Sequence, residues 1–517
     1  MSLLSIILFL VLIFSLVLNY LSLSYKKNAM EIINEMGNGY NLGNIFDCYD
    51  KDEEIKNPID QITLCGNSFP TKLIISSIKK YGFNTIRFPV TWINFIDEHG
   101  NINADWMNSV KEVVDLILNN NMYCILNLEN DGKNGNWLSK GIKEKDKYIN
   151  LWSQIANEFK SYDEHLVFES MDIFEDINYR ASSNNYDYSS LLDLSQSFID
   201  TVRSTGENNI DRLLLVSGAN AELDMTFNSK YEIPKDPSNK TAKSIHYYIP
   251  YYFTLESDYV DTYIDEIDEE EYYVYSIRSW GNDIDYNELI NNFELIKSNF
   301  IDKGIPVVIS EVGVLTEEEK KLDSIREYLY VVFSISANYN GIISCLWDTS
   351  NKGKGNMNFF NRETNQWYDE KIGDNFKQIS KGRYVKPLDY YGNTNSLTTY
   401  VDDNYEMFIQ IGYRKPLKAI FNLKYDESVY DYIYFDTYDK NGEPYTIDIE
   451  KGKITKEYYG SFTYTIDLSQ EDCNGYLVLE KLSGFNLIQF NYLTVEFSET
   501  FAFFDYTNYK EAISSSI

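Results

Sequence analysis

Between residue 29 and about residue 380, short apolar runs alternate with longer amphipathic segments. Most of the short runs are continuously apolar rather than strictly alternating, which is typical of strands buried on both faces of a parallel sheet. Eight runs are predicted to be strands: residues 39–44, 84–90, 123–129, 166–172, 212–218, 243–249, 306–312 and 341–348.

The segments between these runs have the period of amphipathic helices. In residues 105–121, apolar side chains recur at three- and four-residue intervals and share one face. Residues 71–82 end in glycine, a common helix stop. Residues 317–336 begin with acidic residues, which suit the positive end of a helix dipole. Strands and helices in this order predict an α/β fold, a (β/α)8 TIM barrel over residues 29–380.

The pattern changes from about residue 385 to short β-rich segments separated by turn residues, such as Asn441-Gly442. Regular spacing of such segments predicts an antiparallel sandwich. We therefore expect a linker over residues 381–399 and a smaller all-β sandwich domain over residues 400–517. A sandwich appended to a larger domain is a candidate carbohydrate-binding module.

The first 28 residues are apolar for about the length that a bilayer core needs. We expect export through residues 1–28, either as a signal peptide cleaved after Ser24 or as a membrane anchor through residues 3–23. A positive residue before the apolar run is lacking, and only Lys26 and Lys27 flank it. The glycosylation sequon Asn239-Lys240-Thr241 is compatible with a secreted or extracellular protein.

The net charge of −33 argues against nucleic acid or an anionic membrane as a partner, because phosphates would be repelled. The aromatic fraction of 16%, with 45 Tyr, suits a sugar-binding site. Codon bias toward Tyr, Asn, Ile and Lys explains the same composition equally well. The oligomeric state is left open.

Five cysteines and three histidines limit the metal chemistry available to the chain. Cys48 and Cys65 lie in one loop-like region and could form a disulfide, worth roughly 3 kcal/mol. Cys124 and Cys345 lie in apolar runs and are predicted to be buried thiols. No Cys-x-x-Cys or Cys/His cluster is present in the sequence, so we expect neither a metal site nor a cofactor.

Polar side chains stand at the ends of most predicted strands. In a barrel, the C-terminal strand ends carry the active or binding site. The side chains at these ends are Asn41, Arg87, Glu129, Asp172, His246 with Tyr248, Glu311, and Trp347. This ring of polar groups with an indole contains no phosphate-binding glycine loop.

Seven segments occur in an order that resembles the glycoside hydrolase family 5 cellulase barrel. They are "MGNGYNLGN", "GFNTIRFPVTW", "MYCILNLEND", "LVFESMD", "IHYYIPYYFT", "IPVVISEVG" and "LWDTSNKGKGNMNFFNRETNQWY". The resemblance covers about residues 30–375. It implies a retaining glycosidase for β-glucans, which uses two carboxyl groups about 5–5.5 Å apart, one as nucleophile and one as acid/base.

The resemblance also implies roles for individual residues. Glu311 would be the nucleophile, and Arg87 beneath it would keep it ionised and oriented. Tyr248, in the family's His-x-Tyr pattern with His246, would hydrogen-bond the nucleophile. Trp347 would form the floor under the sugar. The remaining substrate-binding candidates are Asn41, Glu129 and Asp172. From the residues alone, structural salt bridges and core packing are competing interpretations of these side chains.

Two motifs depart from the family pattern. In active members the fourth-strand motif ends Asn-Glu, and the Glu is the acid/base. This chain has Asp172-Ile173-Phe174 there, so Ile173 occupies the acid/base position and cannot transfer a proton. The third-strand motif normally carries a histidine where this chain has Glu129. Losing proton transfer typically costs about 10²–10⁴-fold in rate.

We therefore expect a hydrolytically impaired, cellulase-like protein that is secreted and binds β-glucan or a related polysaccharide. The first alternative is an active retaining β-1,4-glucanase (endoglucanase) with a relocated acid at Asp172, Glu175 or Glu129. The second alternative is a structural or interaction barrel. Glu169, which lies inward of the strand end, is expected to be structural.

Overall fold

The structure is a computed structural model, and its described residues form two compact units. They are residues 26–49, 55–132, 136–174, 186–256, 262–264, 271–273, 280–281, 283–316, 320–350, 355–382, 394–400, 406–412, 416–424, 433–438, 444–447, 453–458, 461–470, 474–481 and 489–501. The first unit falls within Met1–Tyr259, Leu295–Glu318 and Ser336–Arg383, and the second within Val260–Glu294, Glu319–Ile335 and Tyr384–Ile517.

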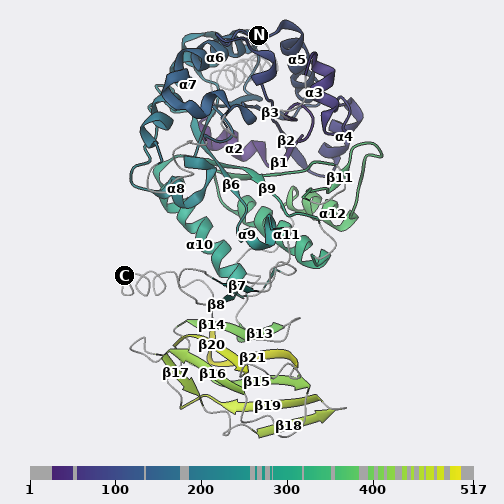
Figure 1. Ribbon diagram of the computed structural model, residues 1–517, viewed down its shortest axis with the longest axis vertical. Helices are drawn as coiled ribbons and strands as arrows, with labels where there is room; N and C mark the ends of the chain where they lie inside the picture. Colours follow the sequence, from purple (N-terminus) through teal and green to yellow (C-terminus); the bar gives the residue numbers. More distant parts are fainter. Residues whose placement is uncertain are drawn as a thin grey trace, which may run out of the picture. The chain divides into compact units, whose positions relative to one another are not determined.

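The first unit contains a closed barrel of parallel strands, in the order β1-β10-β9-β6-β5-β4-β3-β2 (Figure 1). The strands are β1 Asn38–Asn41, β2 Phe83–Phe88, β3 Tyr123–Leu126, β4 Leu166–Glu169, β5 Leu214–Ser217, β6 Thr241–Tyr247, β9 Val307–Val312 and β10 Ile342–Leu346. Each predicted apolar run overlaps one of them, which confirms the (β/α)8 TIM barrel. Several strands end before the predicted run does, so the polar ends of those runs lie in the loops.

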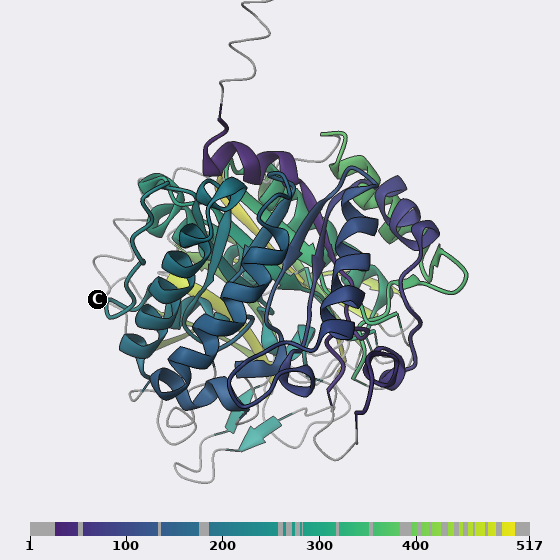
Figure 2. The same cartoon turned by 90° about the horizontal axis from the view of Figure 1, so that it is seen from above.

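Helices follow the strands in the expected alternation. They are α2 Ala29–Met36, α3 Pro58–Leu64, α4 Lys72–Lys80, α5 Ala104–Leu118, α6 Lys145–Phe159, α7 Tyr188–Ser204, α8 Leu223–Phe227, α9 Tyr251–Thr254, α10 Asp283–Asn299, α11 Leu322–Asn338 and α12 Glu370–Ile379. Side-chain caps start several of them: Thr71 accepts from the Ile74 N–H, and Asn103 from the first turn of α5. In Figure 2, α6 and α7 lie side by side outside the strands.

Shorter elements lie in the connections. The 3-10 helices are η1 Ile93–Phe95, η2 Asn130–Gly132, η3 Trp137–Glu144, η6 Glu207–Ile210, η7 Ala219–Ala221 and η8 Ile301–Lys303. Two small hairpins pair β7 Thr262–Ile264 with β8 Glu271–Tyr273, and β11 Phe360–Asn361 with β12 Gln366–Trp367.

The N-terminal end of the barrel is filled with apolar side chains and covered by α2. Ile32, Ile33 and Met36 of α2 are fully buried against the first inward-facing residues of the strands, such as Ile125 and Val308. Each fully buried side chain of this size contributes about 1.5–3 kcal/mol. This end of the barrel is therefore a packed core rather than a site.

The inward-facing side chains become polar toward the C-terminal end of the strands. Along β4, the inward residues change from Val167 to Glu169; along β6 they change from Ala242 to Ser244. Residues two apart share a face of a strand, so this change occurs in layers around the barrel. The polar layer directly supports the side chains described below as the candidate active site.

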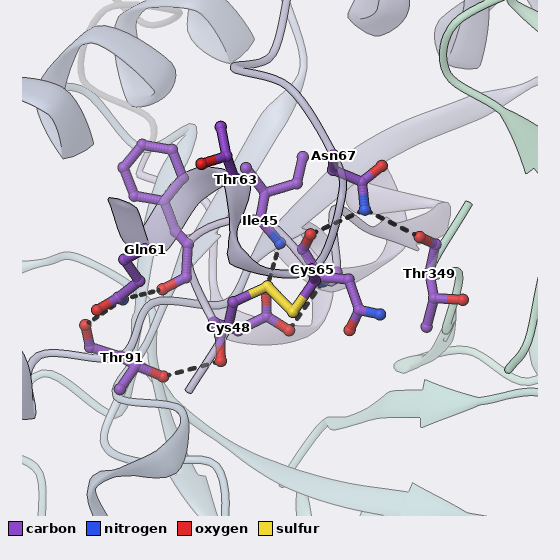
Figure 3. Close-up of a disulfide and its surroundings, with 12 residues drawn as sticks. Ile45, Cys48, Gln61, Thr63, Cys65, Asn67, Thr91 and Thr349 are labelled. Carbon is purple, nitrogen blue, oxygen red and sulfur yellow. Dashed lines mark hydrogen bonds between the residues drawn. A yellow bond between two sulfur atoms is a disulfide. The ribbon is translucent and has the colours of Figure 1, made fainter. Parts of the chain in front are cut away.

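The predicted disulfide between Cys48 and Cys65 is present, with a Cα–Cα distance of 6.0 Å (Figure 3). It links the segment after β1 to the C-terminal end of α3, and Gln61 of α3 donates to the carbonyls of Phe46 and Thr91. Asn67 then bonds the Thr349 carbonyl after β10. The disulfide therefore braces two loops at the C-terminal end of the barrel. As predicted, Cys124 and Cys345 are buried free thiols.

The C-terminal part of the second unit is an all-β sandwich of two antiparallel sheets. One sheet has the order β13-β21-β15-β19-β18 and the other β14-β20-β16-β17. The strands are β13 Thr394–Tyr400, β14 Glu406–Gly412, β15 Pro416–Lys424, β16 Ile433–Tyr438, β17 Pro444–Ile447, β18 Lys453–Tyr458, β19 Ser461–Asp467, β20 Asn474–Lys481 and β21 Gln489–Phe501. The smaller β domain predicted after the barrel is thus confirmed.

Its first strand starts at Thr394, inside the segment expected to be the linker 381–399. The predicted end of that linker was therefore too late. The sequence around Leu397, Thr398 and Thr399 is typical of a loop, but in the structure these residues pair with β21 and form a strand. The expected leader is residues 1–28, and its residues 1–25 lie outside the described part of the chain. The helices that are described are all too short or too polar to cross a bilayer.

Candidate active site

Glu311 reaches the C-terminal end of the barrel through an irregularity between β6 and β9. Ser244 and Ile245 pair with Val308 and Ile309, but the next pair is His246 with Glu311, so the register shifts by one residue. Ser310 already faces inward, where its hydroxyl accepts from Ser244 Oγ at 2.7 Å. Strict alternation would turn the next side chain away. A bulge re-aims it, so Glu311 and His246 lie together.

Arg87 is the centre of the site. It is fully buried at the end of β2, and all of its nitrogens have acidic or amide partners. These are Glu169 (2.7 Å from Nε), Asn41 and Glu311 (both 3.0 Å from Nη1), and Asp172 (2.6 Å) and Glu129 (3.6 Å), both from Nη2. One guanidinium thus faces four carboxylates. Burial lowers the pKa of Arg87, but the charges of these carboxylates outweigh burial and raise the pKa well above its ordinary value.

Asp172 and Glu311 hold His246 between them. His246 Nε2 lies 3.0 Å from Asp172 Oδ1, and Nδ1 lies 3.5 Å from Glu311 Oε2. Burial disfavours the imidazolium, but the negative charges of Glu311 and Asp172 outweigh burial and raise the pKa of His246. The imidazole therefore carries positive charge more readily than a free histidine does.

Glu311 keeps two further partners expected of a nucleophile. Tyr248 Oη donates to Glu311 Oε2 at 3.0 Å, on the side opposite the Arg87 contact to Oε1. Burial, followed by the charge of Glu311, raises the pKa of Tyr248 well above its ordinary value, so the phenol remains a neutral donor. These contacts fix the orientation of the carboxylate, as the resemblance implies.

The protonation of Glu311 differs from the sequence-based expectation. Burial raises its pKa to about 7, and the charges of Asp172 and Glu129 add to burial, while His246 and Arg87 oppose it. Arg87 was expected to keep this carboxylate ionised. Arg87 does act in that direction, but burial outweighs its charge, and the net shift of the pKa of Glu311 is upward.

Ile173 follows Asp172 in the loop after β4. The Asp172 N–H donates to the Leu128 carbonyl at 2.8 Å, which ties this loop to the end of β3. The Asp172 side chain is fully buried, whereas Ile173 is half-buried. Hydrocarbon thus stands at the loop position that the family resemblance assigns to the acid/base.

The other carboxylates proposed as a relocated acid are poorly placed for proton transfer to a ligand. The Asp172 carboxylate lies within 4.8 Å of Glu311 but is bonded to Arg87 and His246 and has no exposed side-chain surface. Glu129 is 3% exposed and accepts from Asn127 Nδ2 at 3.0 Å. Glu175 lies outside the described residues.

Asp172, His246 and Glu311 each offer an atom within 4.8 Å of the others, a spacing that a metal ion could use. In this structure both ring nitrogens of His246 instead face the carboxylates at hydrogen-bonding or ion-pairing distance. The guanidinium of Arg87 already provides positive charge to both acids. The geometry is therefore that of an ion-pair network.

Trp347 follows β10 and is half-buried beside the nucleophile strand. The backbone N–H of Trp347 donates to the carbonyl of Val312 at 2.8 Å, and Val312 follows Glu311 in the chain. The indole packs against Gly43, where a Cβ atom would lie only 3.2 Å from Trp347 Cζ2. Glycine at position 43 thus leaves the space that the indole occupies.

Sequence reasoning missed Tyr40 and Arg362, which hold the residue after Trp347. Asp348 accepts from Tyr40 Oη at 3.0 Å and from the Phe360 N–H at 2.8 Å, and the Arg362 guanidinium bonds the Asp348 carbonyl. Arg362 comes from the β11–β12 hairpin, and only tertiary contact relates it to the site. Glu169 was judged structural, and its bonds to Arg87 and Ser244 agree with that role.

A parallel (β/α)8 barrel with a buried arginine, a carboxylate and an indole at its C-terminal strand ends has the layout of a TIM-barrel glycosidase. The family model described as cellulase, glycosyl hydrolase family 5, matches residues 48–353. The chain therefore belongs to glycoside hydrolase family 5.

Two of the similar proteins are named endoglucanases. Endoglucanase A of Clostridium longisporum is 31% identical over 67% of this chain, which spans 65% of that relative's length. Endoglucanase A of Paenibacillus barcinonensis is 32% identical over 65% of this chain and 86% of the relative.

Solved structures of family 5 proteins are also similar to this chain. A broad-specificity GH5-4 endoglucanase from an uncultured bovine rumen ciliate is 54% identical, with a TM-score of 0.65 over 69% of this chain and 99% of that chain. A mutant family 5 lichenase from Caldicellulosiruptor in complex with cellotetraose is 29% identical, with a TM-score of 0.60 over 69% of this chain and 96% of that chain.

Proposed function

We propose that this family 5 protein binds β-glucan chains at the C-terminal end of its barrel and hydrolyses them poorly. The observation that supports this proposal is Ile173, which directly follows Asp172 and which the motif resemblance assigns to the acid/base position. An unactivated sugar leaving group needs a proton, and an aliphatic side chain has none to give.

The retained half of the site supports binding. Glu311, held by Arg87 and Tyr248, keeps the arrangement of the nucleophile, and Trp347 offers an indole face beside it. Since a retaining mechanism divides its work between two carboxyl groups, loss of one removes most of the rate while the sugar contacts of the other side remain.

Neutral β-glucans are the proposed ligands. Relatives are named endoglucanases, and one similar lichenase is described in complex with cellotetraose. A net charge of −33 disfavours acidic polysaccharides. We extend the proposal to export through residues 1–28, and to carbohydrate binding by the C-terminal sandwich.

One observation favours an active endoglucanase as second candidate. The Asp172 carboxylate lies within 4.8 Å of Glu311, close to the spacing that a retaining pair needs. Against it, the Asp172 side chain is fully buried and bonded to Arg87 and His246, so it does not face a ligand at Glu311 freely. A structural or interaction barrel is the third candidate.

The deciding experiment compares a soluble β-glucan with an aryl β-cellobioside, whose leaving group needs no proton. We expect slow turnover of the aryl substrate, lost in Glu311→Gln, together with little turnover of the glucan and measurable oligosaccharide binding. Efficient glucan hydrolysis that Glu311→Gln abolishes would establish the endoglucanase. Neither turnover nor binding would leave the structural role.

A further inference from the structure

The side-chain amide of Asn67 joins two loops at the C-terminal end of the barrel. Asn67 Nδ2 donates to the Asn44 carbonyl at 2.8 Å and to the Thr349 carbonyl at 3.1 Å (Figure 3). An amide nitrogen carries two hydrogens, so these two bonds use both of its donors. One half-buried side chain thus links the segment after β1 to the segment after β10.

Both of these loops border the Trp347 indole. Thr349 comes two residues after Trp347 in the chain, and Gly43 directly precedes Asn44. A Cβ atom at Gly43 would lie 3.2 Å from Trp347 Cζ2 and 3.3 Å from Cη2, so the glycine backbone packs against the edge of the indole. Asn67 therefore connects the segment that the indole packs against to the segment that carries the indole.

The turn at Asn44 is held from its other end as well. The φ angle of Asn44 is 58°, in the left-handed region that asparagine adopts more readily than most residues. The Asp47 carboxylate accepts from the Asn44 N–H at 2.9 Å and from the Ile45 N–H at 2.8 Å. The N–H of Asn44 is thus bonded to Asp47 and its carbonyl to Asn67, which fixes the backbone beside the indole.

The disulfide ties together the two segments that hold this turn. Cys48 directly follows Asp47, and Cys65 lies two residues before Asn67. The covalent link restricts the positions that the Asn67 backbone can reach, so less entropy is lost when its amide is held between the two carbonyls. Without the amide, these carbonyls would need other donors, and we expect the two loops to move apart to find them.

We propose that Asn67 is a positioning residue that sets the orientation of the Trp347 indole, and that glycan binding depends on Asn67 through this indole. The inference rests on the proposed glycan binding beside Glu311. It adds a residue from outside the barrel strands, which acts through two backbone carbonyls.

A double-mutant cycle tests this role. Asn67→Asp keeps the size of the side chain but replaces the donor by an oxygen that repels both carbonyls. We expect it to weaken the binding of cellotetraose, measured by calorimetry with the full chain, by about tenfold. In the Trp347→Ala background, the same substitution should change the dissociation constant less than about twofold, because the indole through which Asn67 acts is gone.

Asn208→Asp is the matched control. The Asn208 amide also joins two backbone carbonyls, those of Ser161 and Tyr162, at 3.1 and 3.2 Å. It lies in η6, before β5 and hence at the N-terminal end of the barrel, so its loss should leave the dissociation constant unchanged. Unweakened binding in a folded Asn67→Asp variant would overturn the inference, and so would equal weakening with and without Trp347.

Fluorine NMR of protein labelled with 5-fluorotryptophan follows the indole without any sugar. The chain has seven tryptophans, and Trp347→Phe identifies the signal of Trp347. Asn67→Asp should shift that signal, whereas Asn208→Asp should not. An unmoved signal would overturn the inference alone. A shifted signal in a protein whose wild type binds no cellotetraose would overturn the proposed function and would still support the positioning of the indole by Asn67.

Discussion

The carboxylate of Asp172 lies 3.0 Å from Nε2 of His246. Through this contact the loop after β4 holds the imidazole of β6 against Glu311, whose carboxylate is 3.5 Å from the other ring nitrogen. His246 thus lies between two carboxylates, and Asp172 supplies the second negative charge beside its ring.

Replacing Asp172 by Asn should lower the pKa of His246, because one of the two carboxylates that favour the imidazolium is lost. NMR titration of a histidine-labelled sample measures this directly, as the chain has only three histidines. The signals of His99 and His165 should titrate as before. An unchanged His246 would mean that Glu311 alone supports its charge.

Under the proposed function, placing a carboxylic acid at position 173 should raise the rate of hydrolysis. We expect Ile173→Glu to raise the turnover of a soluble β-glucan by about 10²–10⁴-fold, the usual contribution of a positioned proton donor. Turnover of the aryl cellobioside should rise less, since its leaving group departs without a proton. The Ile173→Glu/Glu311→Gln variant is the control and should be inactive. Equal gains on both substrates would contradict loss of the acid as the cause.

Glu311 should make the protein less stable as pH rises. Burial raises its pKa from 4.5 to about 7, so the folded chain keeps a proton that the unfolded chain releases between these values. Its contribution to stability is complete below about pH 4.5 and is lost as pH rises through about 7. Glu311→Gln should remove this loss, worth up to roughly 3 kcal/mol.

Urea unfolding at pH 5 and pH 8 measures the effect. The difference between Glu311→Gln and the wild-type protein should be larger at pH 8. Glu207→Gln, at a half-exposed surface glutamate paired with Lys160, should follow the wild-type curve at both values. Parallel pH dependence of wild-type protein and Glu311→Gln would show that the carboxylate is not held protonated.

Removing Arg87 should destabilise the barrel severely. Arg87→Met leaves four carboxylates around an uncharged side chain at the end of β2, and breaking a buried ion pair by removing one partner costs about 3–5 kcal/mol. Chemical unfolding measures the loss. Lys145→Met, which breaks a partly exposed pair with Asp193, should cost no more than about 1 kcal/mol. Similar losses in both variants would argue against the central role of Arg87.

The disulfide between Cys48 and Cys65 should stabilise the protein by about 3 kcal/mol, given a sequence separation of 17 residues. We expect Cys48→Ser/Cys65→Ser to unfold at lower urea concentration by that amount. A reducing agent should destabilise the wild-type protein and leave the double variant unchanged. If the reducing agent affects both equally, the stability does not come from this bond.

The sequence by itself determined the architecture and most of the membership of the site. Buried parallel strands leave continuous apolar runs, and helices leave a periodic stripe, so both are local signals that need no knowledge of the partners. The strand-end residues Arg87, His246, Tyr248 and Glu311 could be named because a barrel gathers the C-terminal ends of its strands. The assignment of Ile173 to the acid/base position rests on the same reasoning and stays a prediction.

Only the tertiary structure decided how these groups are aimed and charged. The register shift between β6 and β9 turns Glu311 toward His246, and it arises from pairing between strands far apart in the sequence. The sharing of Arg87 among four carboxylates, and the burial that raises the pKa of Glu311, depend on contacts that no local pattern encodes. Electrostatic energies follow separation and burial, which exist only once the chain is folded.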